Sequence, residues 1–215
     1  MLSAIPLYFA AAYMIASGWE SWAHRSLLHA SRRSRRAWRN YGEVGALLRL
    51  AYFYHNTIHH RRTFRKSFFV QFDDQTQKRK LDHALKGSLL QRLEESTYGV
   101  TISGFWELFT FASVPVAFVT VEFALLAPLW LPIGILIALL PLLLTRYMHP
   151  LLHLDAEQHR SEPLRRLICA APLFAYMQRY HFLHHKYGLV NFNLLLGADW
   201  IFRVRRSASA DEVPR

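Results

Sequence analysis

Histidines are the residues of this chain whose type and spacing could do chemistry. Ten of the twelve histidines fall into four groups with short internal spacing. The groups are His24 and His29; His55, His59 and His60; His149 and His153; and His181, His184 and His185. Imidazole is the commonest protein ligand for metal ions. The only cysteine, Cys169, excludes a cysteine-based zinc or iron–sulfur site. The sequence therefore predicts a metal centre with nitrogen ligands.

The spacing inside each group predicts which rings share a metal. On a helix, residues three or four apart lie on one face and can aim their side chains at a common point. The groups with this spacing are His55 with His59, His149 with His153, and His181 with His184 and His185. His24 and His29 are five residues apart, about 140° around a helix, so they need a distorted turn or serve different metals.

The number of ligands predicts the number of metals. Ten imidazoles exceed the capacity of one ion and match two ions at about five ligands each, with positions left for oxygen or water. Imidazole suits iron, zinc and copper, so the ligands by themselves do not name the metal. His83 and His159 lie outside the groups, and we expect no role for them in metal binding.

Apolar runs must position these histidines. The chain is 52% hydrophobic, yet Lys and Arg outnumber Asp and Glu by 26 to 15. Residues 2–22, 105–126 and 129–148 form apolar runs long enough to cross a bilayer as helices, and the pair Ala127-Pro128 predicts a tight turn between the last two. The first run lacks the basic leader of a signal peptide. Such runs also argue against a basic soluble protein that binds nucleic acid.

The basic residues predict the orientation. They follow the first run, precede the second and follow the third, so one side receives nearly all the positive charge and should be cytoplasmic. Every histidine group falls on that side. We expect residues 44–58 and 164–182 to form interfacial helices that close a cytosolic cap, and the basic stretch 61–92 to lie against anionic headgroups.

The predicted fold is therefore an all-α integral membrane bundle of about three transmembrane helices with a cytosolic helical cap that carries the histidines. Residues 1–206 form a single domain, and residues 207–215 form a polar tail that we expect to be disordered. A bacterial inner membrane is the expected location.

Four histidine boxes in order resemble the fatty acid hydroxylase and sterol desaturase superfamily of membrane di-iron enzymes. The boxes are HRSLLH at 24–29, HNTIHH at 55–60, HPLLH at 149–153 and HFLHH at 181–185, with a hydrophobic hairpin between the second and third. The resemblance covers most of residues 19–203, including the closing segment RYHFLHHKYGLVNFNLLLGADWIFR at 179–203. The second box has three residues before its histidine pair, where fatty acid hydroxylases usually have two.

The resemblance implies the reaction and the metal. Two iron ions would bind all ten histidines and use O2 as co-substrate to hydroxylate an unactivated C–H bond of a lipid or acyl chain, and zinc would be a misloaded metal. A desaturase or a carotenoid hydroxylase of the same superfamily is the alternative. Acyl chains, sphingoid bases, aminolipids, sterols and carotenoids all remain open as substrates.

Further residues and partners follow from this chemistry. Ligating histidines usually donate their second N–H to a carboxylate or carbonyl. The candidates for this supporting role are Asp155, Glu157, Asn191 and Asp199. The chain has no haem motif and no flavin or nicotinamide fingerprint, so we expect electrons from a ferredoxin or a b-type cytochrome. A membrane lipid is the expected substrate partner, and nucleic acid is not expected.

Two other functions compete with an oxygenase. A membrane metal-binding or transport protein should carry its ligands along a transmembrane path, whereas these histidines gather at one side. A zinc hydrolase needs a catalytic carboxylate beside its histidines, and the HExxH motif is absent.

Overall fold

The chain folds into helices throughout the part that can be described. The computed structural model describes residues 4–85, 105–209, 211, 212 and 214, with the backbone alone for 105–111. Every regular element within these residues is a helix, which confirms the all-α prediction for them. The basic stretch predicted at 61–92 lies partly outside the described residues, from 86 onward.

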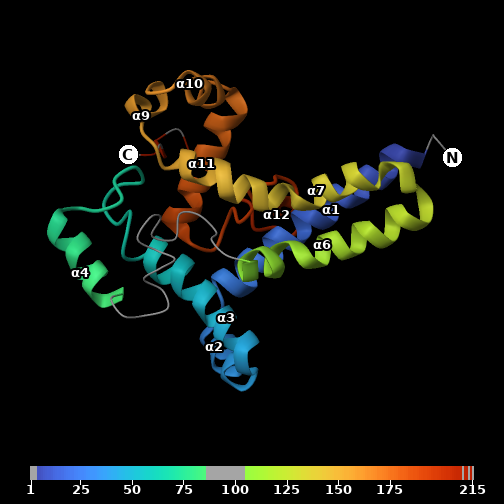
Figure 1. Ribbon diagram of the computed structural model, residues 1–215. Coiled ribbons are helices and arrows are strands. Elements are labelled where there is room, and N and C mark those ends of the chain that lie inside the picture. The colour runs from blue at the N-terminus through green and yellow to red at the C-terminus, as the bar shows by residue number, and fades with distance from the viewer. Residues whose placement is uncertain (1–3, 86–104, 210, 213, 215) are drawn as a thin grey trace.

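Three apolar helices form an elongated bundle (Figure 1). They are α1 (Ile5–Ala23), α6 (Phe105–Leu126) and α7 (Leu131–Leu143), and each contacts the other two. Phe123 and Val119 of α6 are fully buried between them. A Cβ on Gly134 of α7 would lie 2.8 Å from the Val119 Cγ1 atom, so glycine permits the close approach of α6 and α7. Burial of these apolar side chains holds the hairpin together.

The predicted turn between the last two helices is confirmed. Helix α6 ends at Leu126, and a single 3-10 turn, η5 (Pro128–Trp130), leads into α7. Pro128 suits the first position of this turn because its fixed φ is already helical and no hydrogen-bonded N–H is lost there.

One described helix is long and apolar enough to cross a membrane. It runs without interruption from Pro128 to Leu152, 25 residues. In α6, side chains are described only from Ala112 onward, and the apolar helix Ala112–Leu126 is shorter than the candidate membrane helix. The three transmembrane helices predicted from the sequence are therefore not confirmed. Helix α1 departs from a simple lipid-facing helix because its second half buries polar side chains, among them Ser17 and Glu20, against a later part of the chain.

Three π-helical turns adjoin histidine groups. They are η2 (His24–Leu28), η4 (Phe53–His59) and η6 (Leu144–Met148). In the first, the backbone N–H of His29 donates to the His24 carbonyl five residues back at 3.0 Å, which is the distorted turn that this pair required. In the second, the N–H of His60 donates to the His55 carbonyl at 3.1 Å. Such π-turns bring residues five apart onto one face and often mark functional sites.

Two helical arms leave the bundle at the end where the histidines lie (Figure 1). One arm consists of α2 (Arg32–Ala37), η3 (Trp38–Asn40) and α3 (Gly42–Tyr52), which continues into η4. The other consists of α9 (Ala156–Arg160), α10 (Pro163–Cys169) and α11 (Pro172–Tyr187). Both predicted cap segments are therefore helical, although Pro172 divides the second into two helices. The other helices in the described residues are α4 (Gln75–Leu85), α8 (His149–Leu152) and α12 (Ala198–Ile201).

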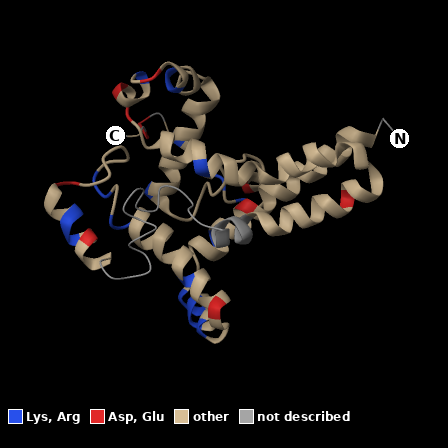
Figure 2. Cartoon of the chain, viewed as in Figure 1, with Lys and Arg blue, Asp and Glu red and all other residues tan. Residues whose placement is uncertain are grey.

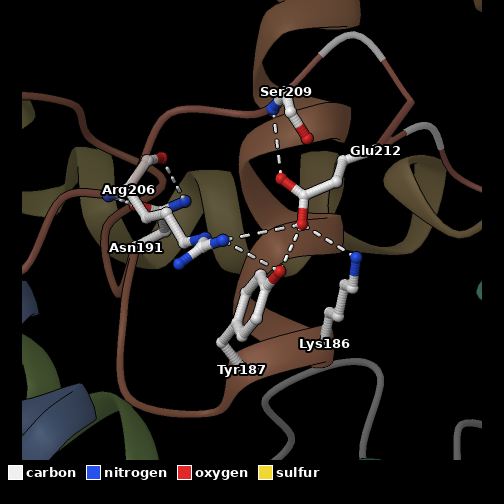
Figure 3. A network of polar contacts seen from close by, with 6 residues as sticks. All are labelled: Lys186, Tyr187, Asn191, Arg206, Ser209 and Glu212. Atoms are coloured by element: carbon white, nitrogen blue, oxygen red, sulfur yellow. Dashed lines mark hydrogen bonds and ion pairs between the residues drawn. The ribbon is translucent and has the colours of Figure 1, made fainter.

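The carboxylate of Glu212 ties the described residues of the tail to α11 (Figure 3). Only 5% of this side chain is exposed. It accepts hydrogen bonds from the Lys186 ammonium at 2.8 Å, from the Ser209 N–H at 3.1 Å and from the Tyr187 hydroxyl. The described part of the tail therefore contacts α11 through Glu212, and the disorder predicted for residues 207–215 stays a prediction.

Candidate metal centre

The ten histidines of the four boxes meet in two clusters. Cluster A consists of His24, His29, His55, His60 and His184. Cluster B consists of His59, His149, His153, His181 and His185. Within each cluster, the candidate ligand atoms all lie within 4.8 Å of one another. The tertiary structure therefore brings together every histidine that the sequence predicted as a ligand, in two sets of five.

The division between clusters differs from the one expected from helical spacing. His55 and His59 were expected to share a metal, but they lie in different clusters, and so do His181 and His184. His149 and His153 share cluster B as expected. The π-turn at η4 places His60, five residues on, beside His55, so His59 points away to cluster B.

Four imidazoles of cluster A form a closed ring of nitrogens. The Nε2 atom of His55 lies 3.2 Å from that of His29 and 3.0 Å from that of His60. The Nε2 atom of His184 lies 3.2 Å from that of His29 and 3.1 Å from that of His60. The fifth ligand, His24, places its Nε2 atom 2.8 Å from that of His55.

In cluster B, three imidazoles surround the Nε2 atom of His181. The Nε2 atom of His181 lies 2.8 Å from that of His149, 3.2 Å from that of His153 and 3.1 Å from that of His185. The ring of His59 completes the cluster, with its centroid 4.6 Å from that of His185.

Hydrogen bonding alone does not satisfy these nitrogens. A neutral imidazole nitrogen carries one proton or one lone pair, so the Nε2 atoms of His55 and His181 cannot each bond three neighbours. Both ring nitrogens of His59 are buried without a hydrogen-bond partner in the described part of the chain, which is costly for a polar atom. A metal about 2.1 Å from each nitrogen puts ligands at right angles about 3.0 Å apart. The residues present therefore fit metal ions.

Backbone carbonyls orient three of the rings. The Nδ1 atom of His24 lies 2.5 Å from the Phe192 carbonyl oxygen, that of His184 lies 2.8 Å from the Val190 oxygen, and that of His153 lies 2.9 Å from the Phe68 oxygen. A carbonyl oxygen only accepts, so each Nδ1 carries the proton. The Nε2 lone pair then faces the cluster, as metal ligation requires.

Burial also keeps the rings neutral. Desolvation lowers the pKa of the His184 ring to about 4, and the nearby His149 ring acts in the same direction. For His29, desolvation and then the charge of His184 lower the pKa to about 2. Neutral imidazoles bind metals, whereas protonated ones do not, so the clusters are ready for metal at neutral pH.

Two of the four predicted supporting residues lie elsewhere. The Asp155 carboxylate accepts hydrogen bonds from the backbone N–H groups of Glu157 and Gln158, at 2.9 and 2.8 Å, and thereby caps α9. Glu157 is exposed in the first turn of that helix. Both residues stabilise a helix end. The backbone carbonyls described above, and not these two carboxylates, accept the Nδ1 protons of the ligating rings.

The other two predicted residues support the site indirectly. Asp199 is fully buried and accepts hydrogen bonds from the Ser21 hydroxyl at 2.6 Å, the Tyr180 hydroxyl at 2.8 Å and the Asn193 N–H at 2.8 Å. Asn191 donates to the Tyr180 carbonyl at 3.2 Å. These bonds connect α1, α11 and the loop that supplies the Val190 and Phe192 carbonyls.

Sequence reasoning missed the residue that fixes this loop to α1. The buried Glu20 carboxylate accepts hydrogen bonds from the N–H groups of Leu194 and Leu195, at 2.8 and 2.9 Å, and from the Asn193 amide at 3.2 Å. The bonds hold the loop where the Phe192 carbonyl meets His24. The available signal was a lone carboxylate four residues, about one helical turn, before His24 in a run that is otherwise uncharged.

Phenylalanine rings shield cluster B. The Phe64 ring stacks on His153 with centroids 4.2 Å apart, and the Phe68 ring lies 4.5 Å from the same imidazole. Phe64 adopts a positive φ of 49°, which is uncommon for a bulky residue and marks a constrained position. These rings keep water from one side of the cluster.

The two clusters lie side by side, because the rings of His60 in cluster A and His185 in cluster B have centroids 4.2 Å apart. Each cluster could hold one metal ion, so the chain offers two neighbouring candidate metal sites. Comparison with protein-family models, with curated proteins and with solved structures finds no match to this chain.

Proposed function

We propose that this protein is a membrane-bound di-iron oxygenase that hydroxylates an unactivated C–H bond of a lipid or acyl chain. The observation that carries the proposal is the convergence of ten histidines on two adjacent five-nitrogen clusters. In the superfamily that the four histidine boxes resemble, such a set of ligands holds two irons.

The nitrogen spacing argues against a tetrahedral zinc ion. The ring of four Nε2 atoms in cluster A has edges of 3.0–3.2 Å. Right-angled ligands about 2.1 Å from a metal are about 3.0 Å apart, whereas tetrahedral ligands are about 3.4 Å apart. Zinc in structural sites is tetrahedral, so the observed edges favour a five- or six-coordinate ion. On a six-coordinate ion, five nitrogens leave one position for oxygen.

The protein's own residues prepare the site. When bound, two irons would supply O2 reduction and the oxidation of the substrate carbon. The carbonyls of Val190, Phe192 and Phe68 hold the proton of each partner ring at Nδ1. Phe64 and Phe68 limit access of water, which favours oxidation of an organic substrate over loss of the oxidant to solvent.

The connection to the apolar bundle supports a lipid substrate. The candidate membrane helix Pro128–Leu152 carries His149 in its last turn. One apolar helix therefore runs directly into cluster B. Helices α3, which leads into η4, and α11, which carries ligands of both clusters, lie at one end of the bundle (Figure 1), whereas a metal transporter needs ligands along a path through it. We place this end at the cytoplasmic face, where a ferredoxin or b-type cytochrome can deliver electrons.

Elemental analysis combined with turnover tests the proposal. The purified protein should contain about two irons per chain, and it should form a hydroxylated lipid only with both reductant and O2. The His181→Ala variant should lose this activity, and His83→Ala, which changes an exposed histidine outside both clusters, should retain it. Stoichiometric zinc together with activity that does not depend on O2 would overturn the proposal. Lipid profiles of cells with and without the gene would then identify the substrate.

A further inference from the structure

An arginine pocket lies on the arm formed by α2 and α3, where Lys and Arg residues gather (Figure 2). The cavity has a volume of about 460 Å³ and is lined by five arginines and the Tyr52 ring. The arginines are Arg32, Arg35, Arg36, Arg39 and Arg49. No carboxylate forms an ion pair with any of the five in the part of the chain that the structure describes.

Two of these arginines are held in place. The Arg35 guanidinium lies over the Tyr52 ring, 4.2 Å from its centroid, and its buried Nε atom has no hydrogen-bond partner among the described residues. Arg49 donates to the Trp38 carbonyl at 3.0 Å. A guanidinium fixed by stacking and by a backbone hydrogen bond loses little further entropy when it binds a ligand. The pocket is therefore organised before any ligand arrives.

Five like charges around one cavity repel one another unless an anion neutralises them. The guanidinium group presents parallel N–H donors that match the oxygens of phosphate, often two at a time. We propose that this pocket binds a phosphate group, borne either by a lipid headgroup or by a free phosphorylated compound. The inference is independent of the metal and of the reaction.

Two hydrogen bonds connect the pocket to cluster A. The Tyr52 hydroxyl donates to the Asn56 side-chain oxygen at 3.0 Å, and the Asn56 amide nitrogen lies 3.0 Å from the His29 Nδ1 atom. Phe53 and Thr57, which line the pocket, belong to η4, the same π-helical turn that carries His55 and His59. A bound phosphate would therefore restrain the element that presents ligands to both clusters.

Calorimetric titration of the whole chain, as purified in detergent, tests the proposal. The first arm uses inorganic phosphate and pyrophosphate. The second arm titrates the protein with phosphatidylcholine vesicles that either contain or lack phosphatidic acid. Binding confined to phosphatidic acid identifies a lipid headgroup, whereas binding of the inorganic anions as well identifies the phosphate itself; either result supports the pocket.

A matched pair of charge variants separates the pocket from general basicity. Arg32→Gln/Arg36→Gln changes two exposed lining residues, and Arg160→Gln/Arg166→Gln removes the same charge from two exposed positions on the other arm. We expect the first variant to weaken phosphate binding by about tenfold or more and the second by less than about twofold.

Three results would overturn the proposal. They are equal weakening by both variants, no binding of any phosphate probe to the unmodified protein, and phosphate binding that is unchanged in Arg32→Gln/Arg36→Gln. Because no turnover is measured, failure of the oxygenase proposal would leave this test intact.

Discussion

His59 and His60 are neighbours in the chain, yet they belong to different clusters. Their rings lie at 74° to each other with centroids 5.1 Å apart, His59 in cluster B and His60 in cluster A. His184 and His185 repeat this relationship, with rings at 88° and centroids 6.0 Å apart. In each pair, a single peptide bond therefore links a ligand of cluster A to a ligand of cluster B.

Single histidine variants should remove one metal each. We expect His59→Ala to lose the metal of cluster B and His60→Ala that of cluster A, so that each retains about one ion per chain of the two. Elemental analysis measures the content, and loss of magnetic coupling between the ions reports the missing partner. His83→Ala is the control, because its side chain is exposed and outside both clusters. If His59→Ala and His60→Ala lose the same ion, the division into two clusters is wrong.

The Glu20 carboxylate should be needed for stability and for cluster A. In Glu20→Ala, the N–H groups of Leu194 and Leu195 lose their acceptor in a buried position. We expect a loss of about 3 kcal/mol in the free energy of unfolding and about tenfold weaker metal binding, because the Phe192 carbonyl no longer orients His24. Chemical denaturation and metal competition measure both quantities.

Glu157→Ala is the matched control for that carboxylate. Its side chain is exposed on α9, so stability should change by less than about 0.5 kcal/mol. Metal binding that falls in Glu157→Ala and not in Glu20→Ala would instead favour the supporting role first predicted for Glu157.

The metal-depleted protein should lose stability as the pH falls. Burial lowers the pKa of the His184 ring from 6.5 to about 4 in the folded chain. Between these values the unfolded chain binds more protons, so this contribution to stability is complete above pH 6.5 and is lost as the pH falls toward 4. Thermal unfolding across this range should show a falling Tm and a weaker dependence in His184→Ala. A Tm that stays constant from neutral pH to about pH 4 would contradict the buried, neutral state.

The tail contact should depend on the Glu212 carboxylate. Its hydrogen bonds with Lys186 and Tyr187 hold the pKa of Glu212 well below its usual range, so the contact should persist at neutral pH and weaken under strongly acidic conditions. In Glu212→Gln, limited proteolysis near Ser209 should become several-fold faster, because local opening becomes easier. Glu157→Gln, at an exposed position on α9, should cleave at the unmodified rate. Equal cleavage in both variants would show that other contacts hold the tail.

The sequence by itself determined which histidines could bind metal and the helical class. Ten histidines in short groups beside uncharged runs predict nitrogen-ligated metals at the end of an apolar bundle, because ligand type and hydrophobicity are properties of each residue. The five-residue spacing of His24 and His29 predicted either a distorted turn or ligation of different metals, and the π-helix η2 provides the distorted turn. The orienting groups of His24, His153 and His184 are backbone carbonyls, which no residue type reveals.

Only the tertiary structure decided how the ligands divide. Regular helical geometry paired His55 with His59, but the π-turn at η4 advances the chain by one residue and gives His60 to His55's cluster. The role of Glu20 likewise depends on Leu194 and Leu195, more than 170 residues away in the chain, so local spacing carries no trace of it. Short-range patterns determined which residues can bind metal, and contacts between distant segments decided where each one points.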